Sequence, residues 1–201
     1  MKSVVLNNNF NKNFNSLEFS RILKSLLEVK AICLLVILNV LVYIFTILSV
    51  SDYYYMILGL NALFFEGFYH QLLSSIFMHG SAEHLGMNML ALIAFGYRLE
   101  RALGAFNFAL LYLLGGVLTN LLSLSYLYFE PYSNLVGASG AICVLFGFMA
   151  YFMPMLRSGL FVGLMIMSFA PMLLGVQVAW YAHLFGFGVG FGAGFLKARK
   201  G

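Results

Sequence analysis

Charged residues are scarce in this chain. Asp, Glu, Lys and Arg make up 9% of its 201 residues, whereas hydrophobic residues make up 62%. A typical soluble domain has about 25% charged residues, so this composition excludes an ordinary water-soluble globule. Cysteine is scarce too: Cys33 and Cys143 fall far apart in the predicted bilayer, so no disulfide is expected, and both are predicted to be packing residues. The mean hydropathy of +0.93 indicates an integral membrane protein.

The chain contains several long apolar runs. Runs of roughly 20 residues recur along it, which is the length that a helix needs to cross a bilayer. Residues 1–30 are predicted to form a short cytoplasmic tail, with a surface helix near residues 17–29, and residues 198–201 a cytoplasmic C-terminal end. We expect an all-α, polytopic membrane protein whose domain covers residues 31–197, with six spans at residues 31–50, 84–103, 106–127, 138–155, 159–174 and 180–197.

The basic residues indicate how these helices are oriented. All eleven lie on one side of the six-span arrangement, whereas the connections on the opposite side carry Asp52, Glu66, Glu83 and Glu130. Because Lys and Arg are retained on the cytoplasmic side, both termini are predicted to be cytoplasmic. The net charge of +4 suits contact with anionic lipid, and no nucleic-acid partner is expected. The basic residues are Lys2, Lys12, Arg21, Lys24, Lys30, Arg98, Arg101, Arg157, Lys197, Arg199 and Lys200.

The connection at residues 51–83 is long and rich in aromatic residues. It contains Tyr at 53, 54, 55 and 69 and Phe at 64, 65, 68 and 77. Aromatic side chains favour the interface between lipid and water. We therefore expect this segment to lie half-sunk in the membrane beside the bundle and to contain short helical pieces.

Two polar residues lie inside apolar segments at matching depth. Ser139 opens the fourth predicted span and His183 lies near the start of the sixth, and both spans enter from the outer side. Either residue alone would more often serve packing or a hydrogen bond between helices. A serine beside a histidine that can accept its proton is a nucleophile, however, and polar groups at membrane depth usually have a function. The pair predicts a catalytic dyad.

A third group of polar residues opens the second predicted span. His84 and Asn88 are one turn apart on the same helical face. Their N–H groups are suitable donors to the oxyanion that forms when a peptide carbonyl becomes tetrahedral, although Asn88 alone is equally suited to a hydrogen bond between helices. No metal is expected, because Glu83 and His84 do not form the His-Glu-x-x-His motif of zinc proteases. No cofactor motif is found either.

Glycines are concentrated in the last predicted span. Gly186, Gly190 and Gly194 recur at every fourth position and therefore line one helical face. Such stripes of small residues allow two helix backbones to approach closely. We expect the fourth span to be the partner, because Ser139 and His183 must come within hydrogen-bond distance for chemistry.

These motifs resemble those of the rhomboid intramembrane serine proteases over about residues 31–197. The segment 137–140 is similar to the family's GxSG motif, residues 182–190 to its AHxxGxxxG motif, and residues 84–88 to its HxxxN motif. The resemblance implies a six-helix rhomboid-like bundle in which Ser139 attacks, His183 acts as base without an aspartate, and His84 and Asn88 stabilise the oxyanion. Two positions depart from the family pattern. A Trp-Arg pair of many members is replaced by His70-Gln71, and an aromatic residue that stacks on the catalytic histidine is replaced by Cys143.

The sequence therefore predicts an endopeptidase that cleaves single-span membrane proteins near the outer face, in a bacterial plasma membrane. The fifth span and the connection at residues 171–180 are the expected gate for the substrate. A catalytically silent relative that binds membrane helices is the alternative, but such proteins usually lack the serine or the histidine. A transporter would need paired repeats or broken helices, which the sequence does not contain.

Overall fold

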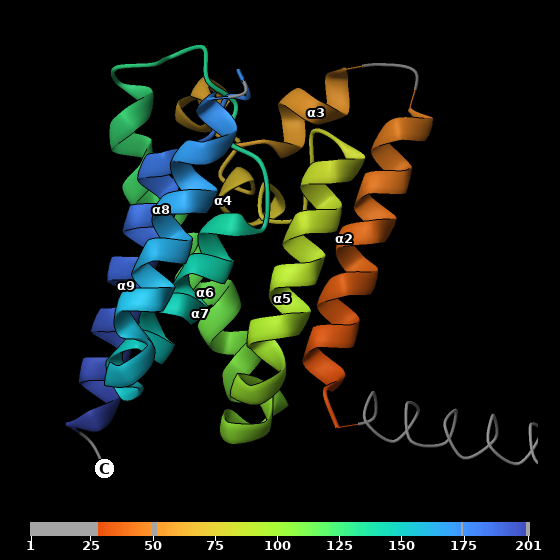
Figure 1. Ribbon diagram of the computed structural model, residues 1–201. Coiled ribbons are helices and arrows are strands. Elements are labelled where there is room, and N and C mark those ends of the chain that lie inside the picture. Colours follow the sequence, from red (N-terminus) through yellow and green to blue (C-terminus); the bar gives the residue numbers. More distant parts are fainter. Residues whose placement is uncertain (1–27, 50–51, 174, 200–201) are drawn as a thin grey trace, which may run out of the picture.

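The computed structural model describes residues 28–49, 52–173 and 175–199 as a helical bundle (Figure 1). The tail expected over residues 1–30, with its surface helix, lies almost entirely outside these ranges. The described helices, in chain order, are α2 (Lys30–Leu48), α3 (Tyr53–Leu58), the 3₁₀ helix η1 (Ala62–Glu66), α4 (Gln71–Ser74), α5 (Ala82–Leu103), α6 (Ala105–Leu127), α7 (Ser139–Phe152), the 3₁₀ helix η2 (Pro154–Leu156), α8 (Arg157–Leu173) and α9 (Trp180–Ala198).

The six long helices coincide with the six predicted spans to within about three residues at each end. By length and composition, α2, α6 and the segment Pro154–Leu173 are each sufficient to cross a membrane, and α7 is a shorter apolar helix. Helices α5 and α9 are less apolar because α5 carries polar side chains and α9 is rich in glycine. These two helices supply His84, Asn88 and His183 of the candidate site.

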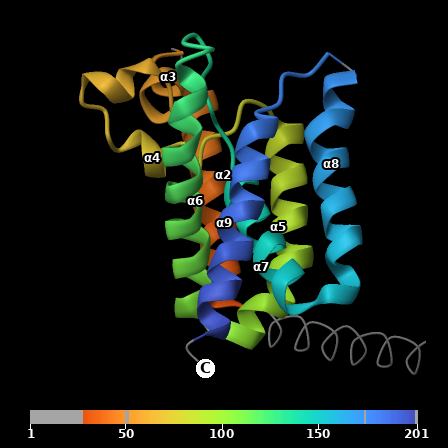
Figure 2. The ribbon, with the colours of Figure 1, turned by 90° about the vertical axis from the view of Figure 1, so that its left-hand side faces the viewer.

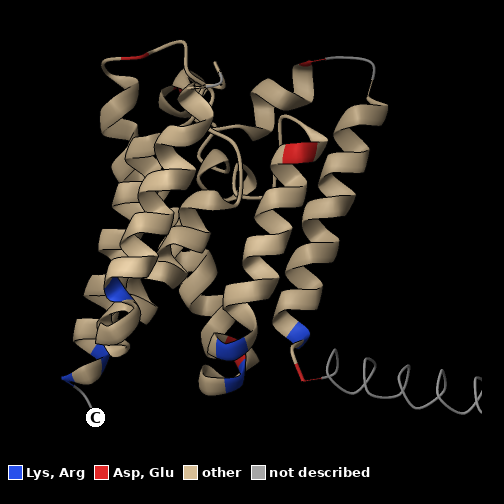
Figure 3. Cartoon of the chain, viewed as in Figure 1, with Lys and Arg blue, Asp and Glu red and all other residues tan. Residues whose placement is uncertain are grey.

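The surface of the bundle is apolar along its length and charged at its ends. On α2, for example, Leu34, Ile37 and Leu41 are each more than half exposed. Figure 3 shows Lys and Arg gathered at the end that holds the C-terminus, whereas the charged residues at the opposite end are acidic. An apolar belt between two polar ends is the surface that a bilayer requires.

The connection between α2 and α5 folds into α3, η1 and α4, as expected, and lies at one end of the bundle beside α6 (Figure 2). Asn120 of α6 attaches it: its Nδ2 atom donates to the carbonyl of Leu72 at 2.9 Å and to the Ser75 hydroxyl at 2.9 Å. The connection is thereby fixed against the bundle on the side where the candidate site lies.

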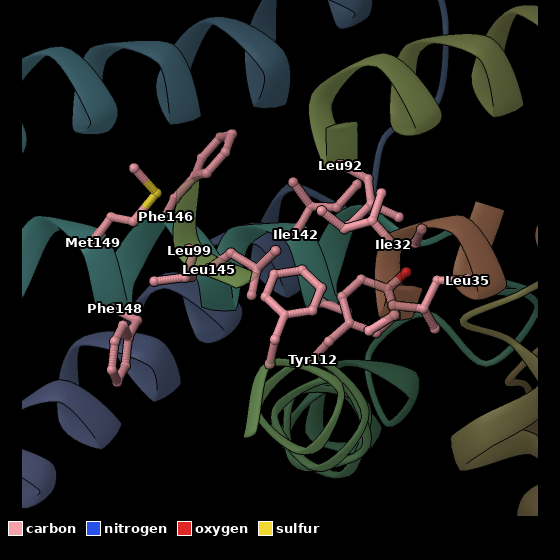
Figure 4. Packing of buried hydrophobic residues seen from close by; sticks show 14 of the residues in the cluster. Ile32, Leu35, Leu92, Leu99, Tyr112, Ile142, Leu145, Phe146, Phe148 and Met149 are labelled. Carbon is pink, nitrogen blue, oxygen red and sulfur yellow. The ribbon is translucent and has the colours of Figure 1, made fainter. Parts of the chain in front are cut away.

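Helix α7 is the axis of the bundle. Its residues from Gly140 to Ala150 are all buried, and their neighbours come from α5, α6, α8 and α9. Figure 4 shows Ile142 and Leu145 of α7 packed together with Leu92 of α5, Tyr112 of α6 and Ile32 of α2. A side chain at the start of α7 is therefore surrounded by helix ends from several parts of the chain.

Helices α7 and α9 make the closest contact in the bundle, and glycine makes it possible. A Cβ atom added at Gly186 would overlap the carbonyl oxygen of Gly140, and one at Gly190 would overlap that of Val144. From the other side, a Cβ atom at Gly147 would overlap the carbonyl oxygen of Phe187. The glycine stripe of the last span thus packs against the fourth span, which confirms the predicted pairing.

A buried carboxylate fixes the start of α2. Glu100, near the end of α5, is 1% exposed, and its two oxygens accept the backbone N–H groups of Ala31 and Ile32, both at 2.9 Å. The first N–H groups of a helix have no partner within the helix, and the helix dipole favours a negative charge there. Glu100 therefore joins α5 to α2 at the basic end of the bundle.

We predict that Gly190→Ala lowers the thermal stability of the protein, because the added methyl group overlaps the backbone of α7 at Val144. Overpacking of this kind costs about 1–3 kcal/mol. Gly188→Ala is the matched control, since a Cβ atom there meets nothing within 4 Å. Thermal melting in detergent should show a lower Tm for Gly190→Ala alone. Equal melting of Gly190→Ala and the wild type would contradict the close packing of α7 and α9.

Candidate active site

Ser139 is the first residue of α7 and is held there by the preceding loop. The loop is joined to the connection before α5 by a reciprocal pair of backbone hydrogen bonds between Leu60 and Leu135, at 2.9 and 2.8 Å. Closer to the serine, Gly137 donates its N–H to the carbonyl of Ser75 at 2.9 Å. The Ser139 side chain itself remains partly exposed, so a reactant can reach it.

Of the two glycines around Ser139, Gly137 is required by geometry and Gly140 is tightly packed. Gly137 has a φ angle of 121°, which side-chain-bearing residues rarely adopt, and an added Cβ would lie 2.7 Å from the His84 ring. At Gly140 an added Cβ would lie 3.2 Å from the Thr119 side chain and 3.9 Å from the carbonyl oxygen of Ala182. Gly137 thus allows α5 to lie against the loop, and Gly140 lies tightly against Thr119 of α6.

His183, in the first turn of α9, contacts Ser139 directly. Its Nε2 atom lies 2.9 Å from the Oγ atom of Ser139, within hydrogen-bond distance. The imidazole is 4% exposed, so it is almost completely removed from solvent. The structure therefore brings together the two residues that the sequence analysis selected as a dyad.

Ser168 of α8 lies on the far side of the imidazole and was not selected from the sequence. Its Oγ atom is 2.9 Å from Nδ1 of His183 and donates to the carbonyl of Leu164 at 2.7 Å. Ser168 is fully buried, and between Gly159 and Leu173 it is the only residue with a polar side chain. A single hydroxyl inside an apolar span was the signal that could have identified it.

His84 and Asn88, the proposed oxyanion donors, lie on α5 against Gly137, two residues before Ser139. The helix begins at this point because Ser81 caps it: the Ser81 hydroxyl accepts the N–H of His84 at 3.1 Å. Asn88 donates one N–H of its amide to the carbonyl of His84 at 2.9 Å, which leaves the second N–H available.

His79 is a further residue of the cluster that the sequence analysis did not assign to it. It is 2% exposed, its ring meets that of His84 edge to face at 5.0 Å, and its Nε2 atom accepts the N–H of Ala138 at 3.5 Å. Its Nδ1 atom lies 3.3 Å from the carbonyl of Phe77, to which it donates when Nε2 accepts. Burial, reinforced by the nearby His84, lowers the pKa of His79 to about 4, so the ring is neutral at physiological pH.

The remaining histidine lies elsewhere. His70 contacts the carbonyl of Ile57 at 3.0 Å in the connection before α5. Within residues 28–49, 52–173 and 175–199, no group of three His, Cys, Asp or Glu side chains is arranged to hold a metal ion. The chemistry that the described cluster can perform is that of a hydroxyl nucleophile beside an imidazole, with N–H donors on α5.

Comparison with known proteins gives the family of this chain. The family model of the Rhomboid domain matches residues 66–200, so the chain belongs to the rhomboid family. It is therefore an integral membrane protein of a family that includes intramembrane proteases.

Among its curated relatives, the putative rhomboid protease YdcA of Bacillus subtilis is 32% identical over 150 residues, which cover 71% of this chain and 74% of YdcA. RHOMBOID-like protein 4 of Arabidopsis thaliana is 37% identical over 135 residues, or 63% of this chain and 33% of that protein. The rhomboid protease GluP of Bacillus subtilis is 37% identical over 91 residues, or 45% of this chain and 17% of GluP. The matched region thus covers 33% of the length of RHOMBOID-like protein 4 and 17% of the length of GluP.

The structure places Gln71 and Cys143, at the two positions that depart from the expected family pattern, in the interior. Gln71 is fully buried and donates from Nε2 to the carbonyls of Met56 and Ile57 at 3.1 and 3.3 Å, so it fixes the connection before α5. Cys143 is also fully buried. If Gly186 carried a Cβ atom, that atom would lie 3.1 Å from the Cβ atom of Cys143. The small side chain at position 143 lies within the close contact between α7 and α9.

Proposed function

We propose that this protein is an intramembrane serine endopeptidase in which Ser139 is the nucleophile and His183 the general base. The observation that carries the proposal is the 2.9 Å contact between Ser139 Oγ and His183 Nε2, made by a buried imidazole and a partly exposed serine. Two of the relatives named above are called rhomboid proteases, which supports the same reaction.

In the proposed reaction, the Oγ atom of Ser139 bonds to the carbonyl carbon of the scissile peptide while its proton passes to Nε2 of His183. The tetrahedral intermediate collapses, the C–N bond breaks, and His183 gives the proton to the departing amine. Water then attacks the acyl-enzyme and transfers a proton to His183. The second collapse releases the carboxylate product and returns the proton to Ser139.

We assign the stabilisation of the oxyanion to His84 and Asn88, with the backbone N–H of Ser139. The assignment rests on the position of both α5 side chains against Gly137 and on the second N–H of the Asn88 amide, which is not used by the bond to His84. Donors fixed before the reaction stabilise developing charge without reorganisation, and this effect is large in a site of low dielectric constant.

The proposed substrates are single-span membrane proteins, cut near the outer end of the span. A helix satisfies all its amides internally, so it must unwind before a peptide carbonyl can reach Ser139. Gly, Pro or Ser near the cut lower the cost of unwinding, and family resemblance implies a small residue such as Ala before the cut. The end of the bundle that carries Lys and Arg, where α2 begins and α9 ends, is assigned to the cytoplasm. A bacterial plasma membrane is part of the same proposal; YdcA, matched over most of its length, is a bacterial protein, whereas RHOMBOID-like protein 4 is a plant protein.

We also propose α8, with the connection that follows it to Trp180, as the gate for the substrate. Helix α8 buries only Leu160, Leu164 and Ser168, one narrow stripe, whereas α7 is buried along most of its length. In Figure 2, α8 stands apart from the other long helices at the end where the site lies. Displacement of α8 therefore breaks fewer contacts than displacement of any other helix around α7, and α8 returns before the chemical step because Ser168 contacts His183.

The proposal predicts that purified wild-type protein cleaves a transmembrane peptide with small residues at its outer end, and that Ser139→Ala and His183→Ala each abolish cleavage. The double mutant should be no worse than either single mutant, because the two residues act as a unit. Mass spectrometry of the products in detergent locates the cut. Cleavage by Ser139→Ala, a cut in the cytoplasmic half, or a wild type that binds the peptide without cutting it would each contradict the proposal.

Replacing Asn88 tests the oxyanion assignment. Asn88→Ala should lower kcat by about 10- to 1,000-fold, because one well-placed donor is lost, and should change peptide binding little. Met87→Ala is the matched control on the same helix, since Met87 is 69% exposed whereas Asn88 is buried. Steady-state kinetics on the same peptide measure both variants. A kcat for Asn88→Ala equal to that of the control would assign Asn88 to packing alone.

A further inference from the structure

We propose that Ser168 is a positioning residue that holds His183 in the tautomer able to act as a base. The inference rests on the proposed function, because it concerns the orientation of the imidazole beside Ser139. It starts from the two contacts of the Ser168 hydroxyl, 2.7 Å to the carbonyl oxygen of Leu164 and 2.9 Å to Nδ1 of His183.

The proton count at Ser168 allows one arrangement in which both contacts of its hydroxyl are hydrogen bonds. A hydroxyl has a single proton to donate, and a carbonyl oxygen can only accept. When Ser168 donates to Leu164, its oxygen is left to accept a hydrogen bond from His183, so the imidazole proton must be on Nδ1. The Nε2 atom then carries a lone pair that faces the Ser139 hydroxyl at 2.9 Å. This is the tautomer that can accept the proton of Ser139.

The opposite tautomer leaves an unfavourable contact. With the proton on Nε2, Ser168 would have to donate to Nδ1, and its oxygen would then face the Leu164 oxygen at 2.7 Å with no proton between them. Ser168 and Leu164 are both fully buried, so water does not screen the repulsion between the two oxygens. Two oxygens at hydrogen-bond distance without a proton repel each other, and this cost selects the Nδ1–H form.

Ser168 thereby takes the orienting role that an aspartate has in a catalytic triad. The bond comes from α8 and approaches the imidazole on the side opposite to Ser139. It also offsets the absence of a stacking ring at position 143, where the chain has a buried cysteine. A neutral hydroxyl orients a histidine less strongly than a carboxylate, because charge-assisted hydrogen bonds are about twice as strong.

Kinetics provide the first test. Ser168→Ala removes the hydroxyl that accepts the hydrogen bond from His183. It should lower kcat by about 10- to 100-fold, the effect of losing a residue that orients another functional group. KM should change less than about twofold. Ser168→Thr keeps the hydroxyl and should restore most of the activity. Ser123→Ala is the matched control, because Ser123 is equally buried and donates to Thr119 at 2.8 Å in α6 without touching the dyad. A kcat for Ser168→Ala equal to that of Ser123→Ala would overturn the proposal.

Nitrogen NMR of the ¹⁵N-histidine-labelled full-length protein provides a second test that needs no cleavage. The signals of His183 are assigned from their loss in His183→Gln. We expect the proton on Nδ1 in the wild type and in Ser139→Ala, and a mixture of tautomers in Ser168→Ala. A proton on Nε2 in the wild type, or an unchanged Nδ1–H signal in Ser168→Ala, would refute the role of Ser168. A third outcome is a wild type that carries the proton on Nδ1 and loses it in Ser168→Ala, but cleaves no peptide. This outcome would uphold the role of Ser168 and refute only the proposed protease function.

Discussion

The close approach of α7 and α9 is the constraint on which the candidate site depends. Glycines on both helices allow backbone to meet backbone, since a Cβ atom at Gly147, Gly186 or Gly190 would overlap a carbonyl group of the other helix. In a bilayer such packing is a main source of association between helices, because lipid is as apolar as the side chains. It also brings the first turns of α7 and α9 together, so that Ser139 and His183 meet within 2.9 Å. A wider spacing of these helices would separate the two side chains.

The polar residues inside the bundle form a small number of long-range connections. Glu100 fixes the start of α2, Asn120 holds the connection before α5, and His79 accepts an N–H from the loop that leads to Ser139. Each joins elements far apart in sequence, and each satisfies groups that would otherwise be buried without a partner. The apolar core positions the helices along their length, while these polar contacts fix the loops and helix ends around the site.

Much of this arrangement was predictable from the sequence. The spans were found because apolar runs of membrane length are a strong signal, and the contact of Ser139 with His183 was anticipated because both fall at the same depth and match family motifs. Ser168, His79 and Glu100 were not selected, since their roles depend on which distant residue they face. Ser168 lies 15 residues before its partner on another helix, and Glu100 lies 69 residues after Ala31. Helical periodicity and motif spacing do not encode such pairs.

The central claim is that His183 makes Ser139 a nucleophile, and covalent labelling tests it most directly. The purified protein is treated with a fluorophosphonate, which reacts with activated serines, and the modified residue is located by peptide mass spectrometry. The account predicts one adduct, on Ser139, and its loss in His183→Ala although Ser139 is still present. No adduct on Ser139 in the folded wild type, or equal labelling of Ser139 in His183→Ala, would contradict it.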